Sequence, residues 1–240
     1  MSGHSKWATI KRKKASIDAK RGKEFTKLIK EITVAARGGG DPTTNARLRL
    51  LLEKAKEINM PLDNTARAIK RGTGEMPGVN YEEQSYEGYG PYGIAVVIDA
   101  LTDNKNRTVA ELRKLFTMHG CTLAESGSVS WMFARLGVLD VSGAQSEDQL
   151  LELLLDYDIK DINFNDDVYT ITCDPKALEI VKKTLRDAGL KVERAELDLV
   201  AQNHTILPKE EFEKASEFLG ELEDHDDVQN MYTNLNNEGL

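Results

Sequence analysis

The sequence predicts an α+β protein in which a basic helical bundle is followed by two α/β sandwich domains, one inserted in the other. Hydrophobic spacing changes from helical to strand-like beyond residue 75, and the charge changes sign at the same place. Residues 1–75 contain 18 Lys and Arg against 8 Asp and Glu, a net charge of +10, whereas residues 76–240 contain 14 against 32, a net charge of −18. This asymmetry indicates a first segment that meets a polyanion and a remainder that keeps the protein soluble.

The composition excludes several classes of protein. The 240 residues are 40% hydrophobic and 30% charged, as in globular domains. The longest apolar stretches, Ile94–Ile98 and Leu150–Leu155, which is interrupted by Glu152, are far shorter than the roughly 20 residues of a bilayer helix. Cys121 and Cys173 have no partner at metal-ligand spacing, so we interpret both as small core residues in a reducing compartment. We therefore expect a cytoplasmic protein without membrane contact.

The basic helical domain is predicted over residues 1–78. Apolar residues at helical spacing, with glycine or proline at the ends, predict three helices after a basic leader, over residues 23–37, 43–59 and 63–72. We expect Thr43 or Thr44 to cap the second helix and Asp63 or Asn64 to cap the third. Gly72 is expected to end the third helix in a left-handed conformation.

A glycine-rich linker, Thr73–Gly93, is predicted to separate this bundle from the sandwich domains. Beyond it we predict three groups of elements: strand 92–100, helix 108–119 and strand 129–133; then strand 138–141, helix 147–156, strands 159–164 and 168–173, helix 175–188 and strand 192–199; then strand 205–207, helix 208–222 and strand 228–232.

The middle group has the β-α-β-β-α-β order of a ferredoxin-like domain, which we place at residues 135–201. The flanking groups are each half of such a domain and would expose a sheet edge alone. Residues 79–134 plus 202–240 are therefore expected to form a second ferredoxin-like sandwich, interrupted by the first. A single larger sheet is the alternative.

No catalytic or metal-binding motif is evident. The four histidines lie in separate contexts without a triad, although tertiary convergence could still create a site. The acidic run around His225 lacks the spaced ligands and glycine of a calcium loop. The glycines at residues 38–40, 72–74 and 88–91 lack the sequence context of a phosphate loop. We expect no enzyme activity, no cofactor and no metal.

The basic region predicts nucleic-acid binding, because Lys and Arg bind phosphate backbones by charge neutralisation and counterion release. A solvated face is the ordinary interpretation of one lysine-rich helix, but three helices and a leader share this bias. The predicted phosphate contacts are Lys6, Lys11, Arg12, Lys13, Lys14, Lys20, Arg21, Lys23, Lys27 and Lys30, with a second patch of Arg67, Lys70 and Arg71.

Two further features bear on this hypothesis. Trp7 could stack on an unpaired base or pack on the bundle. The second and third helices, joined through Asn59–Leu62, imitate a helix-turn-helix but lack a clear turn signature. The expected partner is DNA, or ribosomal or transfer RNA, and we expect a monomer.

Several strings together resemble the YebC family over essentially the whole chain. They are Gly3–Trp7, Ile10–Lys14, Asp18–Lys23, Asn59–Pro61, Arg71–Gly74, Tyr86–Pro91, Thr102–Thr108, Gly127–Val129 and Asp226–Asn230. Tyr92 departs from the family pattern, which usually has glycine there.

The resemblance implies a cytoplasmic bacterial protein with a helical domain and two α+β domains. Family members are widely described as probable DNA-binding transcriptional regulators. Their mitochondrial relatives are translational activators, and the family has been connected with stalled ribosomes. Both roles need a polyanion, so the charge pattern does not choose between DNA and RNA.

Overall fold

The computed structural model describes residues 17–144, 146–165 and 167–236, with side chains from residue 22 onward. The described chain divides into two compact units. The first unit contains residues 17–129 and 208–231, and the second contains residues 130–207 and 232–236. Both combine helices with a β-sheet, so the protein is α+β.

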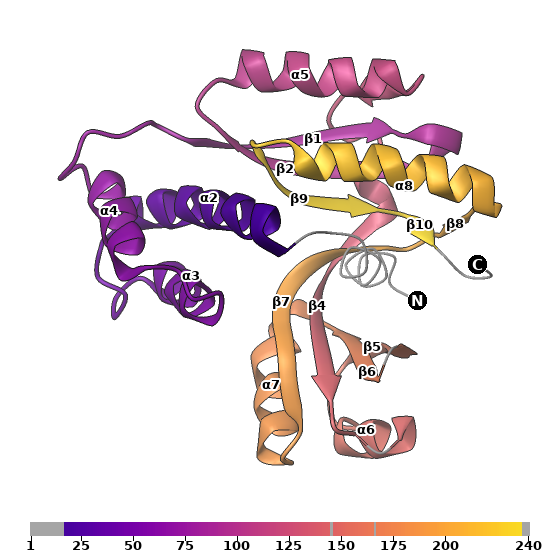
Figure 1. Cartoon of the computed structure of the whole chain (residues 1–240). Helices are drawn as coiled ribbons and strands as arrows, with labels where there is room; N and C mark the ends of the chain where they lie inside the picture. Colours follow the sequence, from indigo (N-terminus) through magenta and orange to yellow (C-terminus); the bar gives the residue numbers. More distant parts are fainter. Residues whose placement is uncertain (1–16, 145, 166, 237–240) are drawn as a thin grey trace. The chain divides into compact units, whose positions relative to one another are not determined.

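The first unit begins with the helices α2 (Ile17–Ala35), α3 (Ala46–Glu57) and α4 (Leu62–Gly72). Figure 1 shows α2 beside α3 and α4. Leu28, Ile32 and Ala35 recur on one face of α2 and are buried in a core shared with α3 and α4. The three predicted helices are therefore present.

The ends of these helices differ from the prediction. Asn45, rather than a threonine, caps α3 by accepting a hydrogen bond from the Leu48 amide at 3.0 Å. The α4 helix begins at Leu62, directly after Pro61, without a side-chain cap.

The prediction that Gly72 ends the third helix in a left-handed conformation was wrong. Gly72 lies inside α4, and it is Gly74 that adopts a positive φ of 82°. A Cβ atom on Gly72 would lie 2.3 Å from the Thr33 carbonyl oxygen and 2.6 Å from Ala36 Cβ. Only glycine therefore allows the backbone of α4 to approach this closely to α2 and the short helix that follows it.

The sheet of the first unit has the strand order β3-β1-β2-β9. Its elements are β1 (Glu82–Tyr89), β2 (Ala95–Thr102), α5 (Lys105–Met118), β3 (Thr122–Ala124), α8 (Lys209–Asp224) and β9 (Val228–Thr233). β1 is antiparallel to both β2 and β3. The helices α5 and α8 pack together through Phe116 and Phe218, whose ring centroids are 5.0 Å apart.

Two predictions in this region were wrong. The strand β1 lies inside the segment Thr73–Gly93 that was predicted to be a linker. Although β1 is mostly polar, it is paired with β2 on one edge and with β3 on the other. Gly88 also leaves room for the Phe116 ring. Residues 129–133 do not form a strand: Ser130–Met132 is a short 3-10 helix and β4 begins at Phe133.

Tyr92 shows why glycine suits its position in the family pattern. It adopts φ 59° and ψ 21° in the turn after β1. This left-handed conformation is unfavourable for a tyrosine and freely accessible to glycine.

The second unit contains the elements of the predicted middle group. They are β4 (Phe133–Ser142), α6 (Glu147–Leu153), β5 (Ile159–Asn165), β6 (Val168–Cys173), α7 (Leu178–Asp187) and β7 (Lys191–Ala201). The strand order is β5-β6-β4-β7, and each neighbouring pair is antiparallel. Leu139, Ile171, Cys173, Val181 and Leu185 belong to its buried core.

This unit also contains a short parallel pair of strands, β8 (Thr205–Ile206) and β10 (Leu235–Asn236). The three-domain division at residues 78, 134 and 201 stays a prediction, since the two compact units have other boundaries. Within the described residues, no helix is long and apolar enough to cross a membrane.

The close approach at Gly72 can be tested by substitution. Gly72→Ala should lower the free energy of unfolding by about 2 kcal/mol, because the new methyl group meets backbone atoms that cannot rotate away. Gly22→Ala in α2 is the matched control: nothing lies within 4 Å of its added Cβ, so stability should stay equal or rise by up to about 1 kcal/mol. Urea denaturation measures both, and equal effects would contradict the packing argument.

Candidate nucleic-acid interface

The predicted phosphate contacts of the leader lie largely outside the described residues. This applies to Lys6, Trp7, Lys11, Arg12, Lys13 and Lys14, and to the side chains of Lys20 and Arg21, whose backbone belongs to α2. Their role as phosphate contacts stays a prediction.

Lys23 and Lys27 of α2 contact the acidic end of α8. Lys23 Nζ lies 2.9 Å from the Asp224 carboxylate, and these side chains are 47% and 72% exposed. Lys27 donates a hydrogen bond to the Glu223 carbonyl oxygen at 3.0 Å. An exposed ion pair contributes at most about 1 kcal/mol, so Lys23 can exchange Asp224 for a phosphate at small cost.

Lys30 does not lie on the solvated surface that the sequence predicts for it. Lys30 is only 7% exposed, and its ammonium group lies 2.8 Å from Asp227 Oδ1. It also donates a hydrogen bond to the Asp226 carbonyl oxygen at 2.8 Å. This buried lysine points to the turn between α8 and β9 and is not available to a phosphate, so the prediction that Lys30 contacts nucleic acid was wrong.

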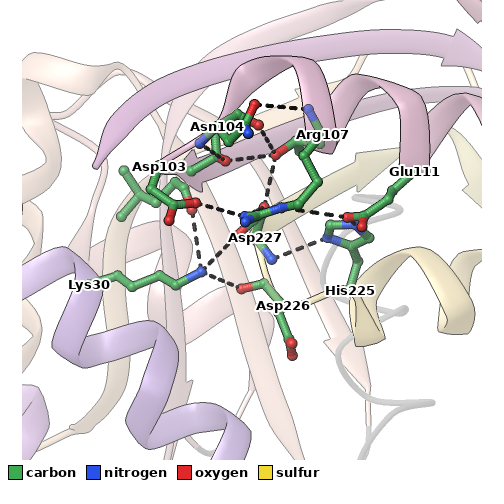
Figure 2. A network of polar contacts seen from close by, with 11 residues as sticks. Lys30, Asp103, Asn104, Arg107, Glu111, His225, Asp226 and Asp227 are labelled. Carbon is green, nitrogen blue, oxygen red and sulfur yellow. Dashed lines mark hydrogen bonds and ion pairs between the residues drawn. The ribbon is translucent and has the colours of Figure 1, made fainter. Parts of the chain in front are cut away.

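Asp227 accepts hydrogen bonds from three elements of the first unit (Figure 2). Besides Lys30 on α2, Arg107 and Thr108 at the start of α5 each place a donor 2.8 Å from Asp227 Oδ2. The Asp227 carbonyl oxygen also accepts a hydrogen bond from the Leu101 amide of β2 at 2.8 Å. One residue in the turn before β9 therefore connects α2, β2 and α5.

The charges around Asp227 set its protonation. Burial acts to raise the pKa of Asp227, but the hydrogen bonds from Lys30, Arg107 and Thr108 outweigh it and hold the pKa well below its usual value. The hydrogen bond and charge of Asp227 in turn raise the pKa of Arg107. The carboxylate is therefore ionised wherever the protein is folded near neutral pH.

Local sequence prepares this arrangement at the start of α5. Asn104 caps the helix by accepting a hydrogen bond from the Arg107 amide at 3.1 Å. The backbone amide of Asn104 donates a hydrogen bond to Thr102 Oγ1 at 2.9 Å. The cap aims Arg107 and Thr108 toward Asp227. These residues lie in the strings Thr102–Thr108 and Asp226–Asn230, which carry the family resemblance. The network around Asp227 was not predicted from the sequence, and these strings were the signal that could have indicated it.

Glu111, His225 and Asp227 bring three possible metal-ligand atoms within 4.8 Å of one another. His225 Nε2 is 3.0 Å from Glu111, and His225 Nδ1 accepts a hydrogen bond from the Asp227 amide. Lys30 and Arg107 already neutralise Asp227, so a divalent cation would have to displace them. The arrangement does not favour a metal.

The second predicted patch lies on one exposed side of α4. Arg67, Lys70 and Arg71 are exposed and have the i, i+3, i+4 spacing that places side chains together on a helix. Arg67 pairs with Asp63 at 2.9 Å, an exposed contact. Among the described residues, Lys70 and Arg71 have no side-chain ion pair. This patch can therefore meet a polyanion without first losing a strong internal contact.

Other exposed cations of the helical region were not among the predicted contacts. They are Arg37, Arg49, Lys54 and Lys56, which have no ion-pair partner among the described residues. Helical spacing was the signal that could have found those on α3, because Leu48 and Ala55 mark its buried side.

Removing the charge of Asp227 tests its structural role. Asp227→Asn should lower the free energy of unfolding by about 3 kcal/mol near neutral pH, because Lys30 then stays buried without a counter-charge. Asp224→Asn removes the same charge from the exposed pair with Lys23 and should change stability by no more than about 0.5 kcal/mol. Urea denaturation compares the two, and a larger effect at Asp224 would contradict the analysis.

The same variant has an expected pH dependence. The pKa of Asp227 is lower in the folded than in the unfolded chain, so its ionised form stabilises the fold above the unfolded pKa of about 3.9. That contribution is lost as the pH falls from there toward the folded-state pKa. Asp227→Asn should therefore lose less stability than the parent protein between about pH 5 and pH 2.

Comparison with known proteins agrees with the family resemblance. The family model for the N-terminal domain of TACO1/YebC proteins matches residues 5–75, and that for their second and third domains matches residues 81–235. A probable transcriptional regulatory protein of Chlorobaculum tepidum is 55% identical over 98% of this chain and 95% of its own length. Its counterpart in Chloroherpeton thalassium has the same identity and coverage.

The fold is also found in a solved structure. The crystal structure of a conserved hypothetical protein from Aquifex aeolicus is 42% identical, with a TM-score of 0.81 over 95% of this chain and 96% of the other. Two family models that together span most of the chain, and relatives with this identity, lead to one conclusion: the chain belongs to the TACO1/YebC family of regulatory proteins.

Proposed function

We propose that the protein is a cytoplasmic, non-enzymatic regulator that binds nucleic acid through its first 75 residues. The observation that carries the proposal is the concentration of a net charge of +10 in this segment, against −18 in the remainder. Phosphate backbones are bound by such cations through counterion release, whereas the acidic remainder repels them. The names of the relatives, probable transcriptional regulatory proteins, favour a role in transcription.

The proposed interface consists of the basic leader, the N-terminal part of α2 and one side of α4. The leader, residues 1–16, contributes Lys6, Lys11, Arg12, Lys13 and Lys14, and the start of α2 contributes Lys20 and Arg21. The helix α4 contributes Arg67, Lys70 and Arg71, and Lys23 and Lys27 become available when their contacts with the end of α8 are exchanged. Each residue neutralises phosphate, and Trp7 could stack on an unpaired base.

A translation factor on the ribosome is the alternative, because the family resemblance extends to mitochondrial translational activators. It uses the same cations on ribosomal or transfer RNA. Two measurements distinguish the roles. A transcriptional regulator should bind a defined duplex about a thousandfold more tightly than scrambled DNA. A ribosome-associated factor should cosediment with ribosomes at physiological salt and show no such preference.

The salt dependence of binding measures the number of phosphates engaged. With about five phosphates on a DNA duplex, the logarithm of affinity should fall against the logarithm of salt with a slope of about −4.5. Replacing Lys11, Arg12, Lys13 and Lys14 by alanine should make the slope shallower by about 3.6, since each contact contributes about 0.9. An unchanged slope would remove the leader from the interface.

The contribution of α4 can be measured in the same way. Lys70→Ala with Arg71→Ala should make the slope shallower by about 0.9, because the four leader residues account for four of the five phosphates and leave one for this patch. Lys183→Ala with Arg186→Ala is the matched control, because it removes an exposed Lys and Arg from α7 in the acidic part of the chain. Equal changes in the two double variants would show that net charge alone, rather than the α4 patch, determines binding.

A further inference from the structure

A groove of about 730 Å³ separates α3 from α4 on a side of these helices that the nucleic-acid patch does not use. Its α3 side is formed by Arg49, Leu52, Glu53 and Lys56. These positions have the i, i+3, i+4, i+7 spacing of one helical face. Leu52 is half-buried, whereas the three charged residues are exposed, and we call them the rim of the groove.

The α4 side of the groove repeats this spacing. It is formed by Leu62, Thr65, Ala66 and Ile69. Leu62 is 77% exposed, although it is a large apolar side chain at the first position of the helix. Thr65 offers little polar chemistry, since its hydroxyl already donates to the Leu62 carbonyl oxygen at 2.8 Å. Two helical faces therefore present an apolar floor that a third helix could cover.

The three cations of the α4 patch lie on another side of the helix. Arg67, Lys70 and Arg71 do not line the groove. A phosphate backbone would gain little from a floor of Leu, Met and Ile side chains, because its affinity comes from charge neutralisation. The groove therefore fits a protein segment with an apolar face better than a nucleic acid.

The charge at the rim specifies this segment further. Arg49 and Lys56 have no ion-pair partner among the described residues, and both line the groove. They are seven residues apart, about two helical turns, with Glu53 between them. A partner helix with two acidic residues seven positions apart, beside its apolar stripe, would complement both cations. The chain's own leader does not fit this description, because it carries the basic residues Lys6 and Lys11–Lys14 where the groove needs acidic ones.

We propose that the groove between α3 and α4 is the docking site for an acidic amphipathic helix of a partner protein. The apolar stripe of that helix covers Leu52, Leu62 and Ile69, and its acidic residues pair with Arg49 and Lys56. Docking on this face leaves the cationic side of α4 free, so the partner and a nucleic acid can bind the same small helix together.

Two synthetic peptides of about four helical turns test the proposal against the full-length protein. Both carry the same leucine stripe; one has glutamates and the other lysines at two flanking positions seven residues apart. Fluorescence anisotropy should show saturable binding of the glutamate peptide, at least about fivefold tighter than the lysine peptide. Equal affinity, or tighter binding of the lysine peptide, would overturn the proposal.

Surface variants locate the bound peptide. Leu62→Glu should weaken binding of the glutamate peptide at least about tenfold, because it removes an apolar contact and adds a like charge. Leu155→Glu is the matched control, since Leu155 is 82% exposed in the second unit, and it should have no effect. If both leucine variants weaken binding equally, the groove is not the site.

Charge reversal on α3 provides a second, independent variant. Arg49→Glu with Lys56→Glu should invert the preference between the two peptides. Lys54→Glu, an exposed cation of α3 outside the groove, should leave the preference in place. A preference that survives the double reversal, or one that Lys54→Glu inverts as well, would contradict the assigned rim.

Two other occupants give distinct results that would overturn the proposal. If a second copy of this chain fills the groove, sedimentation should show a dimer that Leu62→Glu dissociates. If the leader fills it, removing residues 1–16 should raise the affinity for the glutamate peptide. A mass that Leu62→Glu does not change, with an affinity that the deletion does not raise, supports a separate partner.

Discussion

The first unit depends on the neutralisation of one buried carboxylate. Moving an isolated carboxylate out of water costs several kcal/mol, so Asp227 is tolerable only where cations and hydrogen-bond donors surround it. Lys30 supplies one cation from α2 and Arg107 another from the start of α5. A buried ion pair adds little stability compared with apolar packing, but it strongly penalises an arrangement that separates its partners. The pairing therefore favours one placement of α2 on the sheet.

This constraint divides the cations of the basic segment into three kinds. Lys30 is buried and neutralised, whereas Lys23 pairs with an exposed aspartate. Lys70 and Arg71 are exposed and have no ion pair within the described residues. Only the last two kinds can contribute to counterion release. The 18 Lys and Arg residues of the segment therefore overstate the number of its contacts with a polyanion.

The short helix α4 combines three surfaces because each recurs at helical spacing on a different side. Ala68 and Gly72 face α2, where glycine permits close backbone contact. Arg67, Lys70 and Arg71 form the exposed cationic side, and Leu62, Ala66 and Ile69 line the apolar groove. Packing, charge and apolar recognition are thus separated around one axis. A substitution on one side can then change one property while largely sparing the other two.

Much of the local structure could be predicted from the sequence. The strand Val168–Cys173 and the helix near residues 208–222 were expected within two residues of their observed bounds, because period-two and period-3.6 patterns follow from backbone geometry. The strand Glu82–Tyr89 was missed because it is polar and has no apolar alternation to reveal it. Its ladder partners, not its own residues, make it a strand.

The segregation of charge and the family membership could be found without a structure, since both follow from counting residues and comparing strings. The sequence could not distinguish Lys30 from Lys23 and Lys27, which share a side of α2 at the same helical spacing. Tertiary structure decided their roles, because it places Asp227 beside a lysine 197 positions away along the chain. Burial and neutralisation depend on which distant segments meet, and no local pattern records that.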